Sequence, residues 1–378
     1  MIVSDMKTGR GVGVVCPHGD LADAVLESVP RSRTGDVVLL DATDRDFPPA
    51  YEPLHGGGRV DASLTASGVV SAFKKLYGYS WGPRLEHILR YTVLALLEVD
   101  GTSLVSLTRM LSDSRYRESI AHQVQDPLVR SFWLEEFANK PSRWQEEAIA
   151  PIQNKAGAFL ASPILRSIVG QVPSKIDLRE VMDNGKILIV NLSKGSIGED
   201  ASTLLGALLV TGIQQAAMSR SDIDEDKRRD FYLYVDEFGS FQTDAFSTAF
   251  SELRKYRLNL VTANQFIAQL EPTIRDSLLG NVGSILCFQL GIEDAELMAQ
   301  QMGGDLKPLD LISLPKYRAY ARLLVDGMPS KPFSMETIPP KKNRRDSRSD
   351  KTRRASRRRY ARPIADVQQQ VARQLSAL

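Results

Sequence analysis

Apolar runs and amphipathic stretches alternate along much of the chain, and this alternation predicts a sheet covered by helices. Short runs with few polar breaks are typical of strands buried on both faces. We expect such strands at residues 12–16, 36–41, 186–192, 231–235, 258–263, 284–288 and 319–325. Helical periodicity between several of them, for example over 21–29 and 205–217, indicates an α/β fold with a mostly parallel sheet and helices on both faces.

A long central stretch has only helical periodicity. Leu85, Ile88, Leu89 and Leu96 recur at the spacing of one helix face, and further helical stretches begin near residues 104, 120, 129 and 148. The three Trp residues lie in this stretch, where we expect them to anchor a core. We therefore predict an all-α insertion at 53–175 within a sheet domain formed by 1–52 and 176–335.

The predicted strand at 231–235 ends in Asp236 and Glu237. Open parallel sheets bind ligands at the carboxyl edge of their strands. There, one carboxylate can hold a hydrated Mg²⁺ and the next can polarise a water molecule against a phosphate, as in a Walker B motif. Alone, the pattern fits a strand followed by a solvated turn equally well.

The following strand, 258–263, ends in Asn264 and Gln265. An amide at this place can bond a terminal phosphate and report whether it is present. The alternative is a polar residue that simply leaves the strand. Because two consecutive strands end in phosphate-type chemistry, we favour a nucleotide site.

Composition is that of a globular protein: of 378 residues, 43% are hydrophobic and 25% charged. Two cysteines exclude a disulfide framework or a Cys-rich metal site. No apolar run reaches the length of a membrane span, and the N-terminus lacks a signal-peptide pattern.

Charge is strongly asymmetric. Residues 341–362 hold twelve Lys or Arg and two Asp, a net +10, so the rest of the chain carries −8 within the overall +2. We predict that 336–378 is a basic tail with a disordered arm that binds DNA phosphates without sequence preference, and that its last part, 364–378, is weakly helical. The alternatives are an inert solvated tail and one that contacts anionic lipid. The predicted DNA contacts are Lys341, Lys342, Arg344, Arg345, Arg353, Arg354, Arg357, Arg358 and Arg359.

The chain resembles the TraG/TraD-type coupling proteins of conjugation and type IV secretion, a branch of the HerA/FtsK motor ATPases. The resemblance covers nearly the whole chain. Its motifs are Pro17-His-Gly-Asp-Leu21, Asn191-Leu-Ser-Lys-Gly195, Leu233-Tyr-Val-Asp-Glu-Phe238, Glu252-Leu-Arg-Lys-Tyr256, Ala263-Asn-Gln265 and Gly280-Asn-Val-Gly283.

The resemblance implies a RecA-like motor domain that binds ATP and Mg²⁺ between subunits of a hexameric ring and moves DNA. It implies that Asp236 binds Mg²⁺ through water, that Glu237 is the general base and that Gln265 senses the γ-phosphate. His18 and Asp20 would line the nucleotide site. Arg254 would reach a neighbouring subunit's nucleotide, or would simply offset a helix dipole.

The resemblance also implies partners and a location. Beyond DNA, these are relaxase or relaxosome proteins and a membrane secretion channel, with the chain in the cytoplasm and peripheral to the membrane.

The sequence departs from the family at its phosphate-binding loop. It contains no Gly-x-x-x-x-Gly-Lys-Ser/Thr motif, the Walker A loop, which the resemblance would place upstream of Met1. We expect a truncated motor with weak ATP binding, no useful hydrolysis alone, and an open sheet edge. Cys16, Arg257 and Gln289 also differ from the residues usual in the family. Two functions stay open: a DNA-translocating ATPase fragment, and a non-catalytic subunit that binds DNA or relaxase and assembles with intact motors.

Overall fold

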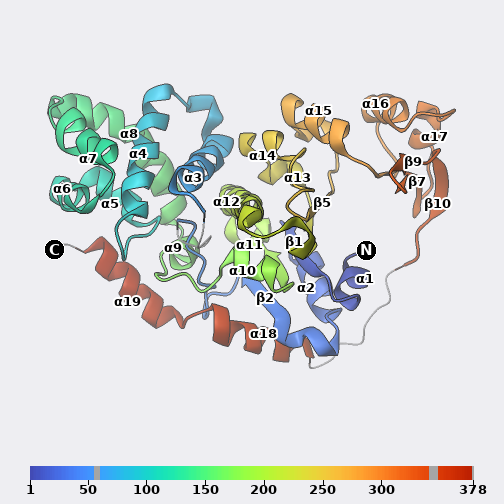
Figure 1. The fold of residues 1–378 in the computed structure, drawn as a ribbon, viewed down its shortest axis with the longest axis horizontal. Coiled ribbons are helices and arrows are strands. Elements are labelled where there is room, and N and C mark those ends of the chain that lie inside the picture. The colour runs from blue at the N-terminus through green and yellow to red at the C-terminus, as the bar shows by residue number, and fades with distance from the viewer. Residues whose placement is uncertain (55–59, 340–347, 377–378) are drawn as a thin grey trace. The chain divides into compact units, whose positions relative to one another are not determined.

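The computed structural model describes residues 1–54, 60–339 and 348–376. The chain divides into two compact units, one comprising Met1–Ala263 with Arg345–Leu378 and the other Asn264–Arg344. Each unit has its own sheet (Figure 1).

The first unit is built on five parallel strands in the order β2-β3-β1-β4-β5. Their bounds are β1 Gly11–Cys16, β2 Val37–Asp41, β3 Ile187–Asn191, β4 Phe231–Val235 and β5 Leu258–Thr262. The register places Val14 of β1 opposite Ile189 of β3 and Tyr234 of β4. Because every neighbour runs parallel, the carboxyl ends of all five strands share one edge, as the sequence predicts.

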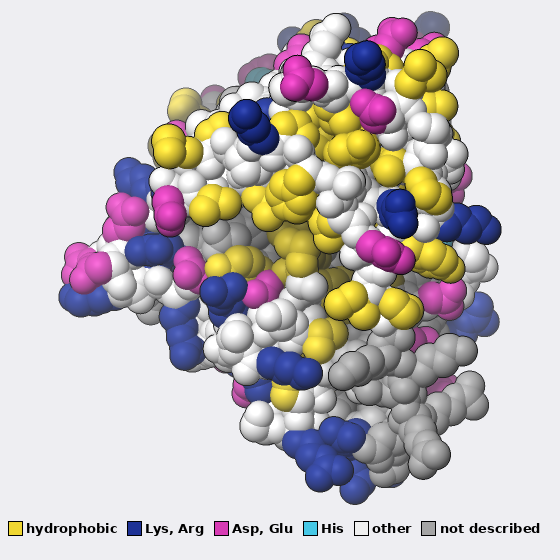
Figure 2. Space-filling model, turned by 90° about the vertical axis from the view of Figure 1, so that its right-hand side faces the viewer, with side chains coloured by type: hydrophobic (Ala, Val, Ile, Leu, Met, Phe, Trp, Pro, Cys, Tyr) yellow, Lys and Arg dark blue, Asp and Glu magenta, His cyan; other side chains and the backbone are white. Residues whose placement is uncertain are grey.

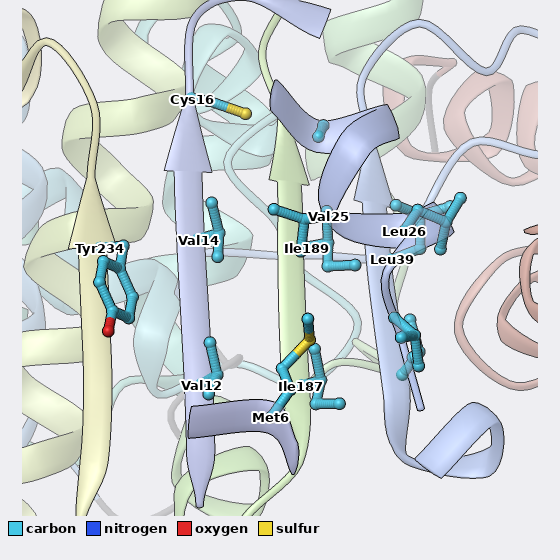
Figure 3. Close-up of a cluster of buried hydrophobic side chains, with 13 residues drawn as sticks. Met6, Val12, Val14, Cys16, Val25, Leu26, Leu39, Ile187, Ile189 and Tyr234 are labelled. Atoms are coloured by element: carbon cyan, nitrogen blue, oxygen red, sulfur yellow. The ribbon is translucent and has the colours of Figure 1, made fainter. Parts of the chain in front are cut away.

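One face of this sheet is covered by α1 (Ile2–Lys7) and α2 (Gly19–Glu27). Figure 3 shows Val12, Val14 and Cys16 of β1 on the same face as Ile187 and Ile189 of β3, beneath these helices. The alternation of strand side chains sends Gly13 and Val15 to the opposite face. The apolar runs predicted these strands correctly because residues on both faces are buried.

The two edges of the sheet differ. Every residue of β2 is buried, although it is a terminal strand. At the opposite edge, four of the five residues of β5 are only half-buried. A protected edge and an open edge therefore coexist in one sheet.

The expected all-α insertion is confirmed, since every element in the described residues between 60 and 170 is helical. The helices are α3 Ala62–Tyr77, α4 Pro83–Leu97, α5 Ser106–Ser112, α6 Ser114–Gln123, α7 Pro127–Ser131, a π-helical turn Phe132–Phe137, α8 Ser142–Ala161 and α9 Pro163–Val169. Trp133 is buried, donates its indole N–H to Tyr91 O at 3.2 Å and packs edge-on against Phe132 and Phe137. Trp133 is therefore a core anchor, as predicted, whereas Trp81 and Trp144 are half-buried.

Between the insertion and β5 the chain returns to the sheet. The helices here are α10 Leu178–Asp183, α11 Lys194–Ile197, α12 Glu199–Met218, α13 Phe238–Phe241 and α14 Asp244–Ala249. The spacing of Phe246, Phe250 and Leu253 predicts one helix after Glu237 that closes at Arg254 and Lys255. That prediction is wrong, because two short helices form instead and turns occupy residues 250–257. The segment Glu199–Asp222 is long and apolar enough to span a membrane, but 72% of its apolar window is buried in the protein, as in a core helix.

The prediction that the last two strands, 284–288 and 319–325, join the parallel sheet is wrong. These residues belong to the second unit. β6 (Ile285–Cys287), β7 (Arg318–Arg322) and β10 (Phe333–Glu336) form an antiparallel sheet in the order β10-β7-β6. A hairpin of β8 (Leu324–Val325) and β9 (Met328–Pro329) links β7 to β10 without a crossover helix, so those strands must run antiparallel.

The helices of this unit are α15 Pro272–Asn281, α16 Ile292–Met302 and α17 Pro308–Ile312, and α16 and α17 pack on Ile285 and Cys287. Of the seventeen exposed large hydrophobic side chains among the described residues, eleven belong to this unit. Figure 2 shows hydrophobic side chains at the surface, interspersed with charged ones.

The predicted disorder is wrong for Arg348–Tyr360, which forms α18, whereas Ile364–Leu375 forms α19 within the stretch expected to be weakly helical (Figure 1). α18 lies along β2, where Ser356 Oγ accepts a hydrogen bond from Leu39 N at 2.8 Å. α19 buries Val367 and Val371 against the all-α part. α18 is the cover that keeps β2 buried.

A glycine in α12 sets how closely that helix approaches the segment after Glu237. A Cβ on Gly206 would lie 2.2 Å from the buried Phe241 ring, whereas one on Gly157 of α8 would meet no atom within 4 Å. We expect Gly206→Ala to destabilise the fold by about 2 kcal/mol through overpacking. Gly157→Ala should stabilise it by about 0.5–1 kcal/mol through backbone entropy. Denaturant titrations of both variants test this, and a Gly206→Ala protein as stable as the wild type would contradict it.

Candidate functional site

Three loops meet where the neighbouring strands β3, β1 and β4 end, and each supplies one charged side chain. His18 follows β1, Lys194 follows β3 and Glu237 follows β4. His18 Nε2 lies 2.6 Å from Glu237 Oε1, and Lys194 Nζ lies 2.8 Å from Glu237 Oε2. Each carboxylate oxygen of Glu237 thus has its own cationic or imidazole partner. We call His18, Lys194 and Glu237 the edge triad.

The backbone fixes Glu237 in an uncommon conformation. Its φ is 48°, in the left-handed region that costs a residue with a side chain about 1 kcal/mol or more. Asp236 N donates to Val15 O at 2.9 Å, and Phe238 N donates to Ala263 O at 3.0 Å. Hydrogen bonds to strands on both sides therefore hold the turn and aim the Glu237 side chain across the ends of β1 and β3.

Electrostatics keep Glu237 ionised. Partial burial raises the pKa of its carboxyl, but the hydrogen bonds from Lys194 and His18, together with their charges, outweigh burial and hold the pKa below its ordinary value. A carboxylate with a lowered pKa is charged throughout the neutral range. Its two oxygens are bound to Lys194 and His18, and these contacts must break before the same lone pairs can accept a proton.

The Mg²⁺ contact expected of Asp236 stays a prediction. Its side chain is half-buried, and Oδ1 accepts from Glu237 N at 3.1 Å. Within the described residues no group of three or more His, Cys, Asp or Glu could hold a metal. Mg²⁺ is commonly held by one or two carboxylates together with water and substrate phosphates.

The other predicted site residues lie in different places. His18 joins the edge triad, whereas Asp20 is exposed in the first turn of α2. Gln265 is exposed and is the second residue of the second unit, two residues after Ala263. Its proposed contact with a phosphate stays a prediction.

Arg254 lies at the opposite end of the strands from Glu237. Leu258 N donates to Leu253 O, and Phe231 N to Arg257 O, so the turn carrying Arg254 sits beside the first residues of β4 and β5. Five strand residues span about 16 Å. Arg254 is exposed there, and its predicted reach to a neighbouring subunit's nucleotide stays a prediction.

Sequence reasoning did not assign Lys194 a role. Its stretch, Asn191 to Gly195, carried part of the resemblance, and its place just beyond a buried strand was the available signal. Its Nζ also lies 3.3 Å from Ser240 Oγ. The pairing with Glu237 joins residues 43 apart in sequence, which no local pattern reveals.

The predicted DNA-binding residues divide into three groups. Lys341, Lys342, Arg344 and Arg345 lie outside the described residues. Arg353 pairs with Asp41 and Asp23, Arg357 pairs with Asp44 at 2.6 Å, and Arg359 donates to Gly35 O at 2.6 Å. Arg354 and Arg358 are exposed on the outer side of α18. Three of the predicted contacts are thus occupied within the fold.

Three-dimensional comparison finds this fold in proteins of conjugation. The bacterial conjugative coupling protein TrwB, in an unbound form, has a TM-score of 0.58 at 16% identity over 84% of this chain and 77% of that chain. TrwB in complex with ADP and Mg²⁺ gives 0.59 at 15%, over 91% and 82%. VirB4 of Thermoanaerobacter pseudethanolicus gives 0.57 at 12%, over 89% and 83%. No family model and no curated protein sequence matches, so the likeness is one of fold.

The inner and outer arginines of α18 should differ in their effect on stability. Arg353→Gln leaves the buried Asp41 carboxylate without its charged partner, so we expect a loss of about 1–3 kcal/mol. Arg358→Gln removes the same charge from an exposed position and should change stability by less than about 0.5 kcal/mol. Thermal denaturation of the two variants checks this; equal losses would show that the Arg353–Asp41 pair does not stabilise the fold.

Proposed function

We propose that this chain is part of a DNA-translocating motor of conjugation or type IV secretion, driven by ATP with Mg²⁺. The observation that carries the proposal is the position of Asp236 and Glu237 at the carboxyl edge of the parallel sheet. A fold shared with TrwB, which has been solved with ADP and Mg²⁺, supports the same reading.

The site residues have separate roles in this proposal. Bound Mg²⁺ would neutralise charge on the phosphates, and Asp236 would hold it through water. Glu237 would orient the attacking water and accept its proton at a carboxylate oxygen. Gln265 would bond the terminal phosphate, and Arg254 would act on the nucleotide of a neighbouring copy in a ring, for which six subunits are expected.

Partners and location belong to the same proposal. The chain would handle DNA delivered by relaxase or relaxosome proteins to a membrane secretion channel, from the cytoplasmic side. The exposed arginines of α18, together with the basic residues before it, would contact DNA phosphates.

The second candidate is a non-catalytic subunit that binds DNA or relaxase and assembles with intact motors. The observation that favours it is the lack of a Walker A motif in the 378 residues. In-frame codons before Met1 that encode a Gly-rich loop ending in Lys-Ser or Lys-Thr would favour the ATPase. Their absence would favour the non-catalytic subunit.

Glu237→Gln tests the catalytic role. We expect DNA-stimulated ATP hydrolysis, measured for the chain extended by such a loop, to fall at least about 100-fold because the base is lost. Binding of a fluorescent ADP analogue should be unimpaired, since a neutral amide does not remove a phosphate contact. Glu252→Gln, which changes an exposed carboxylate on the far turn, is the matched control. Equal hydrolysis with and without Glu237 would remove its assignment as base.

DNA binding should depend on the outer face of α18. We expect Arg354→Gln with Arg358→Gln to weaken binding to any duplex sequence and to reduce the slope of log affinity against log salt by about 2. The control pair, Arg115→Gln with Arg143→Gln, removes the same charge from exposed positions in the all-α part. Fluorescence anisotropy across a salt series measures both, and identical slopes for the two pairs would argue against α18 as a DNA contact.

A further inference from the structure

We propose that Lys194 and His18 form a phosphate-binding pair, and that Glu237 occupies their binding position when no phosphate is present. The ligand class is a terminal phosphate or polyphosphate group. The inference deepens the proposed function and rests on it, because it assigns two more contacts at the same sheet edge. It adds a coupling: the ligand that brings the phosphate also releases the base.

The geometry of the edge triad carries this inference. Glu237 presents two oxygens, and each is bound at short range by a different side chain, at 2.6 Å from His18 and 2.8 Å from Lys194. Two oxygens of one phosphate group present the same kind of acceptor pair to the same donors. Glu237 therefore acts as an internal substitute for a phosphate.

The position is open to a ligand. The side chain of His18 is 56% exposed, and those of Lys194 and Glu237 are 21% and 23% exposed. The contact between His18 and Glu237 is exposed, and a pair of this kind contributes little net stability. The contact between Lys194 and Glu237 is partly buried, so its exchange requires the ligand to supply Lys194 with an equivalent acceptor.

Charge favours the exchange. A phosphate with two negative charges attracts Lys194 and a protonated His18 more strongly than a carboxylate with one. Lys194 also lies 3.3 Å from Ser240 Oγ, so a hydroxyl next to the ammonium can donate a further hydrogen bond to the ligand. The carboxylate of Asp236, which accepts from Glu237 N, opposes the anion, so a bound divalent cation would strengthen binding.

Exchange would also change what Glu237 can do. While His18 and Lys194 each hold one oxygen, about two of the four acceptor positions of the carboxylate are taken, and fewer are left for a water molecule. Once a phosphate takes those donors, Glu237 becomes free to bind water beside the same phosphate. The base would then be exposed only when its substrate is in place, which limits futile proton transfer in the empty site.

Binding of inorganic tripolyphosphate to the full chain tests the proposal without requiring hydrolysis. Isothermal titration with Mg²⁺ present should give about ten-fold tighter binding for Glu237→Gln, because the competing charge is gone. Lys194→Met should bind at least about ten-fold more weakly, and Lys194→Arg should stay within about three-fold of the wild type. Asp224→Asn is the matched control, since it neutralises the partner of Lys227 at 2.6 Å in a loop before β4, and it should not change binding.

The outcomes separate this inference from the proposed function. Glu237→Gln binding no tighter than wild type, or no tighter than Asp224→Asn, overturns the exchange. Should Lys194→Met fail to fold, as judged by its melting transition, Glu237→Gln and Lys194→Arg still decide the question. Tighter tripolyphosphate binding by Glu237→Gln in a protein that never hydrolyses ATP would support the phosphate pair and count against the motor.

Discussion

The parallel pairing of β3, β1 and β4 is the constraint on which the candidate site depends. Adjacent parallel strands end at one edge, so the turns that follow them must lie side by side, and His18, Lys194 and Glu237 meet although they are far apart in sequence. Close pairing of β1 with β4 needs a small residue: a Cβ at Gly13 would fall 2.9 Å from the Phe231 ring. A one-residue slip in this register would turn every core side chain to the opposite face and would separate the triad.

Sequence reasoning located the sheet well because its signal is local. A strand such as Phe231–Val235 is apolar on both faces, and the two carboxylates after it follow directly from chain order. The same reasoning failed where partners are remote. The pattern of β6 and β7 resembles that of the parallel strands, since burial alone does not state direction. Lys194 was quoted within a motif but received no role, because its contact with Glu237 depends on the neighbour relation of β3, β1 and β4, which sequence spacing does not contain.

The C-terminal helices also show that sequence patterns do not reveal partners that are remote in the chain. A segment this rich in Arg, with few apolar residues, has the composition of a disordered arm. It folds because its inner arginines meet Asp41, Asp44 and Asp23, more than 300 residues earlier, and because Ser356 satisfies a backbone N–H of the terminal strand β2. Some acidic side chains of the body and some basic side chains of the tail therefore neutralise one another in direct ion pairs. Only the outer face of α18 is an exposed basic surface, as the composition of the segment predicted.

The location of Arg254 limits how one chain could complete a nucleotide site. The turn that carries it adjoins the start of β4, and Glu237 follows the end of the same strand, about 16 Å away along the strand axis. An extended arginine side chain reaches less than half of that distance, so Arg254 and Glu237 cannot act on one phosphate within a single copy. If Arg254 stabilises charge during phosphoryl transfer, the nucleotide must belong to another copy. A catalytic role for Arg254 and a monomeric enzyme are therefore mutually exclusive, whereas the exchange of Glu237 for phosphate requires one copy alone.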